Sequence, residues 1–193
     1  MESNAVPGFA YVDHIGISVP DLNAAVSFFC SVLGATELYR SMRSGQGDFM
    51  RETFDVAPEA SFELCMLRVP PNLNLELFQW SAPTRRLVPP SASDVGGHHV
   101  CVYVDDIDAA YAYLSAIEGV RMLGPIKTIP PGGPVSGTRW TYFCTPWGLQ
   151  MELVNRAAVV GGPSLVSPRT PGPLPGHEAG TLGTTRRSWN EVV

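Results

Sequence analysis

Two histidines and two glutamates stand at matching places in this chain, and side chains of these types can bind a metal ion. The segment that begins at His14 returns 85 residues later at His99, with His, Val, Asp, Ala and Ala recurring in place. Glu76 and Glu152 each lie in a triplet of an apolar residue, Glu and Leu. A repeat of this kind predicts two copies of one structural unit. Imidazole and carboxylate ligands suit Zn, Ni, Co, Mn or Fe ions.

The alternation of side chains along a strand predicts that these four residues share one face. Successive side chains of a strand point to opposite faces, and apolar residues alternate with all four positions. We therefore expect the apolar positions to pack under helices and His14, Glu76, His99 and Glu152 to lie on the opposite face. Taken singly, each would be an ordinary residue that faces water. The symmetry of the two His-to-Glu pairs, 62 and 53 residues apart, is what indicates a function.

Other side chains of the same parity are candidates for a substrate pocket. Phe78 and Trp80 follow Glu76 at alternate positions, and Cys101 and Tyr103 follow His99 in the same way. A structural role is the alternative for Cys101, and aromatic residues in a sheet often belong to a core. We also assign Arg139 to this pocket, because it lies near the proline- and glycine-rich loop at 130–134.

The elements that must position these residues follow the same order in both copies. Apolar alternation and turn residues predict a strand, a helix and three strands in each copy. The first copy has these at 10–20, 22–33, 36–42, 61–69 and 73–80, and the second at 98–104, 107–118, 120–124, 138–144 and 149–155. The expected fold class is α+β. Two tandem β-α-β-β-β modules, 10–82 and 98–156, would form a cupped, mostly antiparallel sheet with helices on the outer face.

Three further segments do not fit the repeat. Residues 1–9 are expected to form an N-terminal arm, and the segment 83–97, rich in Pro, Ser and Gly, a linker between the modules. From Gly161 to Gly183 there are six glycines and five prolines, a composition that cannot build a core. We therefore expect 157–193 to be a flexible tail.

Composition excludes several classes of function. A net charge of −5 argues against a nucleic-acid surface. No apolar run approaches the roughly 20 residues that span a bilayer, and the first residues do not resemble a signal peptide. The four cysteines form no CxxC motif, so we expect free thiols in the cytoplasm.

These motifs together resemble the vicinal oxygen chelate superfamily, which includes glyoxalase I, methylmalonyl-CoA epimerase, extradiol dioxygenases and bleomycin resistance proteins. The resemblance covers about residues 10–156 and is carried by the segments around His14, Glu76 and His99 and by Thr145-Pro146-Trp147-Gly148 with the strand that follows. It implies paired β-α-β-β-β modules around one divalent ion. By position, the ligands it implies are His14, Glu76, His99 and Glu152.

The ligand set that the resemblance implies is similar to that of glyoxalase I and the epimerases. It implies a lyase or isomerase that moves a proton at a carbon next to a metal-bound carbonyl of a small molecule, with Glu152 as the first candidate base. Glu76 would then be a ligand or a second acid–base group. Two alternatives stay open: an Fe(II)-dependent extradiol-type dioxygenase on an aromatic substrate, and a non-catalytic drug-binding resistance protein. We expect a homodimer, with the cup closed within one chain or across two.

Overall fold

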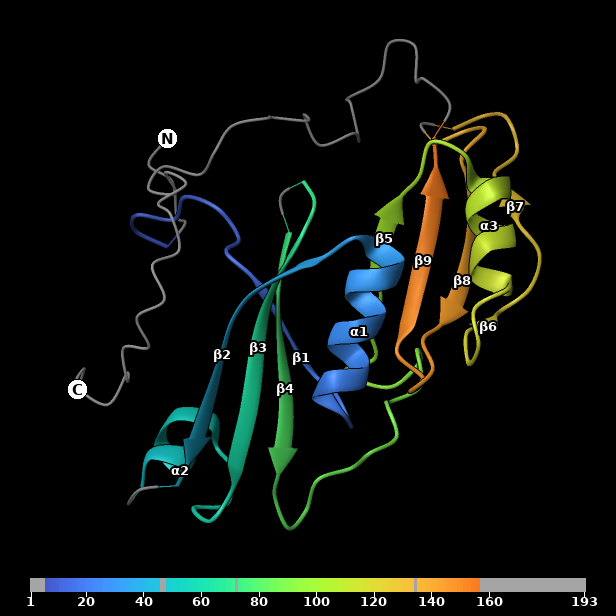
Figure 1. Cartoon of the computed structure of the whole chain (residues 1–193). Coiled ribbons are helices and arrows are strands. Elements are labelled where there is room, and N and C mark those ends of the chain that lie inside the picture. The colour runs from blue at the N-terminus through green and yellow to red at the C-terminus, as the bar shows by residue number, and fades with distance from the viewer. Residues whose placement is uncertain (1–5, 46–47, 72, 134, 157–193) are drawn as a thin grey trace, which may run out of the picture.

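The repeat in the sequence becomes two β-sheets, each covered on one face by a helix (Figure 1). The structure is a computed structural model that describes residues 6–45, 48–71, 73–133 and 135–156. The predicted tail, 157–193, and most of the predicted N-terminal arm lie outside these residues. The α+β class and the mostly antiparallel pairing are confirmed.

The first sheet has four strands in the order β1-β4-β3-β2. β1 pairs with β4 in parallel, and the other neighbours are antiparallel. Its elements along the chain are β1 (Ile15–Ser18), α1 (Leu22–Leu33), β2 (Thr36–Ser44), α2 (Phe49–Phe54), β3 (Ser61–Val69) and β4 (Leu73–Ser81). The parallel pair of β1 and β4 is what brings the two ends of the predicted first module together.

The bounds of α1 follow from local chemistry and agree with the prediction. The side chain of Asp21 accepts a hydrogen bond of 2.9 Å from the backbone N–H of Ala24, which caps the helix. Gly34 ends it in the left-handed conformation, with φ of 67°. The apolar face buries Leu22 and Phe29 against the sheet. This helix therefore fixes which face of the first sheet is core.

The second sheet repeats the plan with small differences. Its order is β5-β9-β8-β6, with β7 also paired to β8, and β5 runs parallel to β9. Its elements are β5 (Val100–Tyr103), α3 (Ile107–Ser115), β6 (Arg121–Met122), β7 (Lys127–Thr128), β8 (Arg139–Cys144) and β9 (Gln150–Asn155). The Asp106 side chain caps α3 by accepting hydrogen bonds from two backbone N–H groups. The parallel pair of β5 and β9 thus corresponds to the parallel pair of β1 and β4 in the first sheet.

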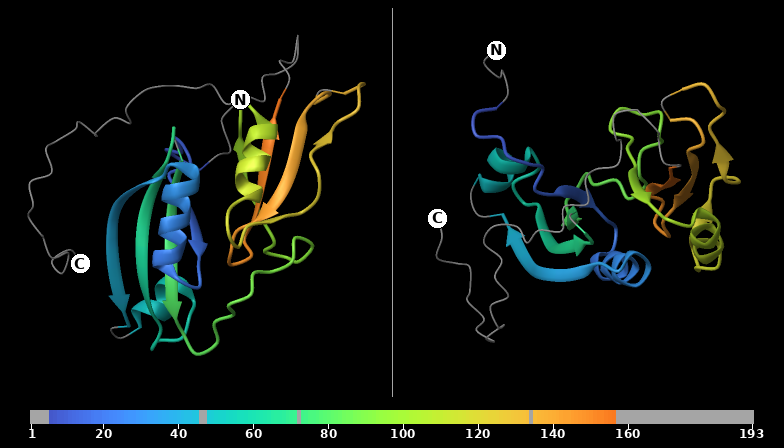
Figure 2. Two further views of the ribbon diagram at one scale, coloured as in Figure 1. Left: turned by 45° about the vertical axis from the view of Figure 1, so that its right-hand side comes forward. Right: turned by 90° about the horizontal axis from the view of Figure 1, so that it is seen from above.

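One hydrophobic core runs through both halves of the chain. Trp147, in the turn between β8 and β9, packs edge-on against Phe28 and Phe29 of α1, with ring centroids 5.4 and 5.8 Å apart. The Tyr113 hydroxyl of α3 donates to the backbone oxygen of Ser31 in α1. Figures 1 and 2 show α1 between the two sheets. The first helix therefore joins the two halves.

Two elements were not predicted, and several bounds differ. α2 has only six residues, and Asp48 makes no side-chain cap, so its sequence carries little helical signal. It is held instead by the packing of Met50 and Phe54 against Phe62. β7 has two residues, β1 is shorter than expected, and α3 ends at Ser115 rather than 118.

Among the described residues, no helix is long and apolar enough to cross a bilayer.

Candidate metal centre

The first candidate pair lies where β1 and β4 run side by side. Their register sets Gly16 against Glu76, and His14 directly precedes β1. Nε2 of His14 is 3.3 Å from Oε2 of Glu76. The Glu76 side chain is 17% exposed and that of His14 39%. Both side chains lie opposite the apolar face formed by Ile17 and its neighbours, as the alternation predicted.

The second pair has nearly the same geometry. β5 and β9 set Cys101 against Glu152, and His99 directly precedes β5. Nε2 of His99 is 3.1 Å from Oε2 of Glu152, with the same two exposed fractions as in the first pair. The sequence repeat is therefore reproduced by the side chains as well as by the backbone.

The structure does not bring the two pairs together. Within the ranges that the structure describes, no group of three or more His, Cys, Asp or Glu side chains is close enough to hold an ion. Each pair lies on its own sheet, and α1 stands between the sheets (Figure 1). Each His–Glu pair is therefore half of the four-ligand set that the sequence predicts, and we call the two pairs the half-sites.

The donor atoms of each half-site fit a divalent ion. Bonds of about 2.1 Å to nitrogen and oxygen, at tetrahedral or octahedral angles, hold neighbouring ligand atoms about 3.0–3.5 Å apart. The His-to-Glu distances of 3.3 and 3.1 Å both lie in this interval. Two ligands are too few for a stable protein site, since zinc sites use three or four. A metal ion at one half-site would therefore need further ligands.

Two tyrosines lie beside the half-sites. Tyr142 pairs with Glu152 across β8 and β9, and its ring meets His99 edge-on at 5.1 Å. Burial, followed by the charge of Glu152, raises the pKa of Tyr142. On the first sheet, burial and then the charge of Glu76 raise the pKa of Tyr39. Only the register across strands places these phenols near the carboxylates, and the sequence does not give that register.

Cys101 and Tyr103 lie on the face of the second sheet that carries His99. Cys101 keeps exposed surface, but desolvation raises the pKa of its thiol to about 12, and the charge of Glu152 and a hydrogen bond to it add to the effect. Tyr103 is 40% exposed. The equivalent positions on the first sheet are Gly16 and Ser18, so the two half-sites have different surroundings.

Phe78 and Trp80 belong mainly to a small second core. They stack on each other with centroids 5.7 Å apart and meet Phe62 and Phe54 edge-on. This cluster fills the space between the sheet and α2. Packing in this cluster therefore restricts the positions of both aromatic side chains. Of the two, only Trp80 also lines the cleft described below.

Arg139 does not join the predicted pocket. It lies two and four residues before the buried Thr141 and Phe143 and so shares their face, which is the helix side of the second sheet. There its guanidinium donates two hydrogen bonds, of 2.6 and 2.8 Å, to the carboxylate of Asp108 in α3. This corrects the assignment of Arg139 to the substrate pocket.

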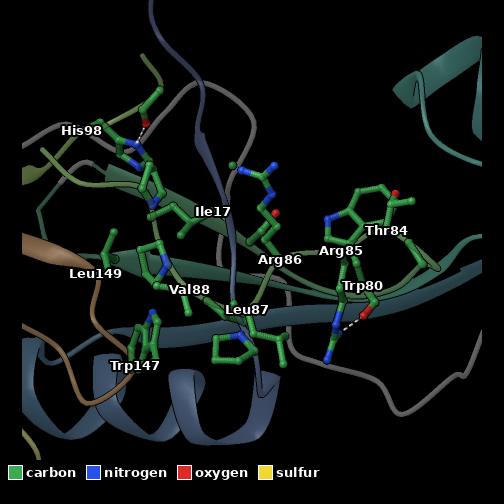
Figure 3. Close-up of a pocket in the computed structure, with 18 of the residues that line it drawn as sticks. Ile17, Trp80, Thr84, Arg85, Arg86, Leu87, Val88, His98, Trp147 and Leu149 are labelled. Atoms are coloured by element: carbon green, nitrogen blue, oxygen red, sulfur yellow. Dashed lines mark hydrogen bonds between the residues drawn. The ribbon is translucent and has the colours of Figure 1, made fainter. Parts of the chain in front are cut away.

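A cleft of about 1290 Å³ opens beside β1 (Figure 3). It is bounded by the strand itself, by Trp80, by the segment 82–96 and by Trp147 in the turn of the second half. It reaches Gly16, the strand partner of Glu76. Arg85, which donates to the backbone oxygen of Trp80, and Arg86 extend along it. Neither His14 nor Glu76 is among the residues that line the cleft, so it adjoins the first half-site through the backbone of β1.

Comparison with known proteins identifies the family of this chain. Residues 13–137 match the model of the Glyoxalase/Bleomycin resistance protein/Dioxygenase superfamily, over more than half of the chain. The chain belongs to this superfamily. That agrees with the resemblance found in the sequence and with the two β-α-β-β-β units of the structure.

Two relatives are similar to this chain over most of its length, and one of them has a named activity. A relative from Actinomyces sp., named 2-epi-5-epi-valiolone epimerase, is 46% identical over 158 residues, which span 82% of this chain and 86% of the relative. The uncharacterized protein YaeR of Escherichia coli (strain K12) is 31% identical over 157 residues, or 77% of this chain and 98% of that protein. The similarity to a named epimerase supports an enzyme of the isomerase type.

A solved structure supports the fold independently. The glyoxalase family protein from Bacillus cereus superimposes with a TM-score of 0.61 at 20% identity, covering 79% of this chain and 99% of its own. At this identity the match bears on the fold alone. The fold of this chain is thus similar to that of the Bacillus cereus protein.

Proposed function

We propose that this protein is a divalent-metal-dependent epimerase that moves a proton at a carbon next to the carbonyl of a small-molecule ketone. The observation that carries the proposal is the pair of half-sites, each with a His nitrogen and a Glu oxygen at the spacing of metal ligands. The 46% identical relative, named as an epimerase, supports the reaction class.

The complete centre in this proposal forms between two copies of the chain. His14 and Glu76 of one copy meet His99 and Glu152 of the other, and the reverse pairing forms a second centre. Two observations support this arrangement: α1 separates the half-sites within one chain, and β1 and β5 each stand at an open end of their sheet. An open strand edge is a ready surface for pairing with another chain, and a two-fold dimer is the commonest assembly.

His14, Glu76, His99 and Glu152 would hold the ion, which when bound supplies Lewis acidity toward the carbonyl oxygen of the substrate. The carboxylate of Glu152 removes the proton from the carbon next to the carbonyl. Inversion requires a proton to return on the other face of that carbon, and the carboxyl group of Glu76, from the other half-site and protonated from solvent, delivers it. General acid–base catalysis of this kind contributes about 10²–10⁴-fold to a rate.

The substrate in this proposal occupies the cleft beside β1. The relative is named for 2-epi-5-epi-valiolone, and the ending of that name denotes a ketone. Ser18 and Thr84 offer hydroxyls to a polar ring, and Trp80 offers an aromatic face. The free cysteines are in keeping with a reducing, cytoplasmic setting.

Exchange of substrate hydrogen with solvent deuterium tests the proposal. The protein is incubated in D₂O with 2-epi-5-epi-valiolone, with and without a chelator, and then reloaded with Zn, Ni, Co, Mn or Fe ions. We expect deuterium at one carbon and a second epimer by NMR, lost with the chelator and restored by at least one ion. Oxygen consumption with Fe(II) and an aromatic substrate would support the dioxygenase instead. Binding without exchange under every condition would support a ligand-binding protein.

A further inference from the structure

A chain of hydrogen bonds leads from β3 to the ring of His14. Nε of Arg68 donates to Oδ1 of Asn74 at 2.6 Å, and Nδ2 of Asn74 donates to the backbone oxygen of Asp13 at 3.2 Å. Oδ2 of Asp13 lies 2.8 Å from Nδ1 of His14. The backbone of Asp13 is thereby tied to the first sheet, and its carboxylate faces the imidazole.

This contact decides which nitrogen of His14 is free for a metal. A carboxylate only accepts hydrogen bonds, so a proton on Nδ1 is donated to Asp13 at 2.8 Å, whereas Glu76 faces Nε2 at the longer distance of 3.3 Å, where a bound ion would take the place of a proton. Nε2 is then the nitrogen with the available lone pair, and it is the one that faces Glu76 at 3.3 Å. A carboxylate behind a metal-binding histidine orients the ring and raises its basicity.

In the second half-site no carboxylate of the described residues is paired with Nδ1 of the histidine. His98 stands at the position equivalent to Asp13, and its Nδ1 lies 2.9 Å from the backbone oxygen of Gly96, so it does not hold His99. Among the described residues, none accepts a hydrogen bond from Nδ1 of His99. The ring of His99 is instead bordered by the edge of Tyr142, which restricts its position but not its tautomer.

We propose that Asp13 is a positioning residue for His14, and that the half-site of His14 and Glu76 is therefore the stronger of the two toward a divalent ion. The inference rests on the proposed function for the presence of the ion, and it adds an order of binding. The ion meets the first half-site, and the second half-site then completes its shell.

Loss of a carboxylate behind a metal-binding histidine typically lowers metal affinity about 10–100-fold. The side chain of Asp13 is 63% exposed, and water weakens such contacts. We therefore expect the lower end of this range, about tenfold. Asp13→Asn keeps a side-chain oxygen that can accept the same hydrogen bond, so it should restore part of the affinity.

The test compares full-length Asp13→Ala, Asp13→Asn and the matched control His98→Ala. Zn²⁺ affinity is measured by competition with a chromophoric chelator. We expect a loss of about tenfold for Asp13→Ala, a smaller loss for Asp13→Asn and no change beyond twofold for His98→Ala. Equal losses in Asp13→Ala and His98→Ala, or no loss in Asp13→Ala, would overturn the proposal.

A second readout does not depend on metal. Nitrogen-15 NMR of the metal-free protein, at alkaline pH where imidazoles are neutral, reports the tautomer of His14. We expect a larger fraction of the Nδ1–H tautomer in the wild type than in Asp13→Ala, where the carboxylate of Glu76 still faces Nε2 and favours a proton there. If the tautomer does not change, the positioning role fails. If it changes as expected but the wild type binds no divalent ion, the proposed function fails while the role of Asp13 in orienting His14 stands.

Discussion

Nε2 of His99 lies 3.1 Å from Oε2 of Glu152, and this contact repeats the one of 3.3 Å between His14 and Glu76. In both cases the histidine directly precedes an edge strand, and the glutamate lies on the parallel neighbour of that strand. One structural rule therefore makes both half-sites, and each can be altered without direct effect on the geometry of the other.

Mixing two inactive variants should restore activity if the centre is shared between copies. His14→Ala and His99→Ala each damage both centres of a homodimer. A mixed dimer keeps one centre in which His14 of one subunit and His99 of the other are both intact. After random exchange of subunits we expect about a quarter of the wild-type exchange rate and metal content.

Size-exclusion chromatography with light scattering serves as the control, because it shows whether both variants form dimers and exchange subunits. A mixture that stays inactive despite exchange would place each complete centre within a single chain.

Glu152→Gln should slow the removal of the substrate proton more than it changes binding. The amide keeps the size of the side chain but cannot take up the proton, so we expect deuterium exchange to fall about 10²–10⁴-fold. Glu76→Gln is the matched variant, and it should reduce epimer formation more than exchange. The rates are compared by NMR after metal content has been equalised. The reverse pattern would exchange the roles of the two glutamates.

The thiol of Cys101 should react slowly with alkylating reagents for a residue with exposed surface. Burial, and next the charge of Glu152, raise its pKa to about 12, so it is protonated at neutral pH, and only the thiolate reacts. Removal of the neighbouring charge in Glu152→Gln should lower the pKa and speed alkylation, with Glu76→Gln unchanged. Peptide mass spectrometry of the metal-free protein, as a function of pH, measures the rate.

Arg139→Gln should leave epimerase activity unchanged, because its side chain lies on the helix side of β8. Its effect should appear at Asp108 instead. The hydrogen bonds from Arg139 lower the pKa of Asp108, so the ion pair persists above the ordinary pKa of about 3.9 and is lost as the pH falls through the lowered value. NMR titration of the Asp108 carboxyl should show its pKa rising toward 3.9 in the variant. A loss of activity would return Arg139 to the substrate site.

Phe29→Ala should destabilise the whole chain. The side chain is fully buried and contacts both its own sheet and Trp147, so we expect a loss of about 3–5 kcal/mol in the free energy of unfolding. Tyr113→Phe removes only an exposed hydroxyl contact to the same helix and should cost about 1 kcal/mol or less. Urea unfolding followed by circular dichroism measures both.

Most of the fold could be predicted from the sequence, because the features that define its helices and strands are local. The cap at Asp21 and the stop at Gly34 define α1, and apolar alternation placed β3 and β4 within a residue. The repeat added the second half by analogy. α2 was not predicted because its six residues make fewer than two helical turns and its stability comes from tertiary packing of Met50 and Phe54.

The sequence predicted each His–Glu half-site but not the distance between the two half-sites. Alternation correctly predicted the faces of the four ligands, but the distance between the half-sites depends on how α1 and Trp147 dock, which is a long-range contact. The pairing of Tyr142 with Glu152 is set by strand register, which the sequence does not give. Arg139 was assigned to the pocket by its nearness to a loop, although it shares its face of β8 with the buried Phe143, on the helix side of the second sheet.

The packing of Trp147 against α1 also determines how the molecule can be divided. A cut in the segment 83–97 would leave the rings of Phe28 and Phe29 uncovered in the first half. In the second half, the side chain of Trp147 would lose the rings against which it packs. Neither fragment would then close its own core. The two pieces should instead fold by mutual recognition when they are mixed, as a complementing pair rather than as two autonomous domains.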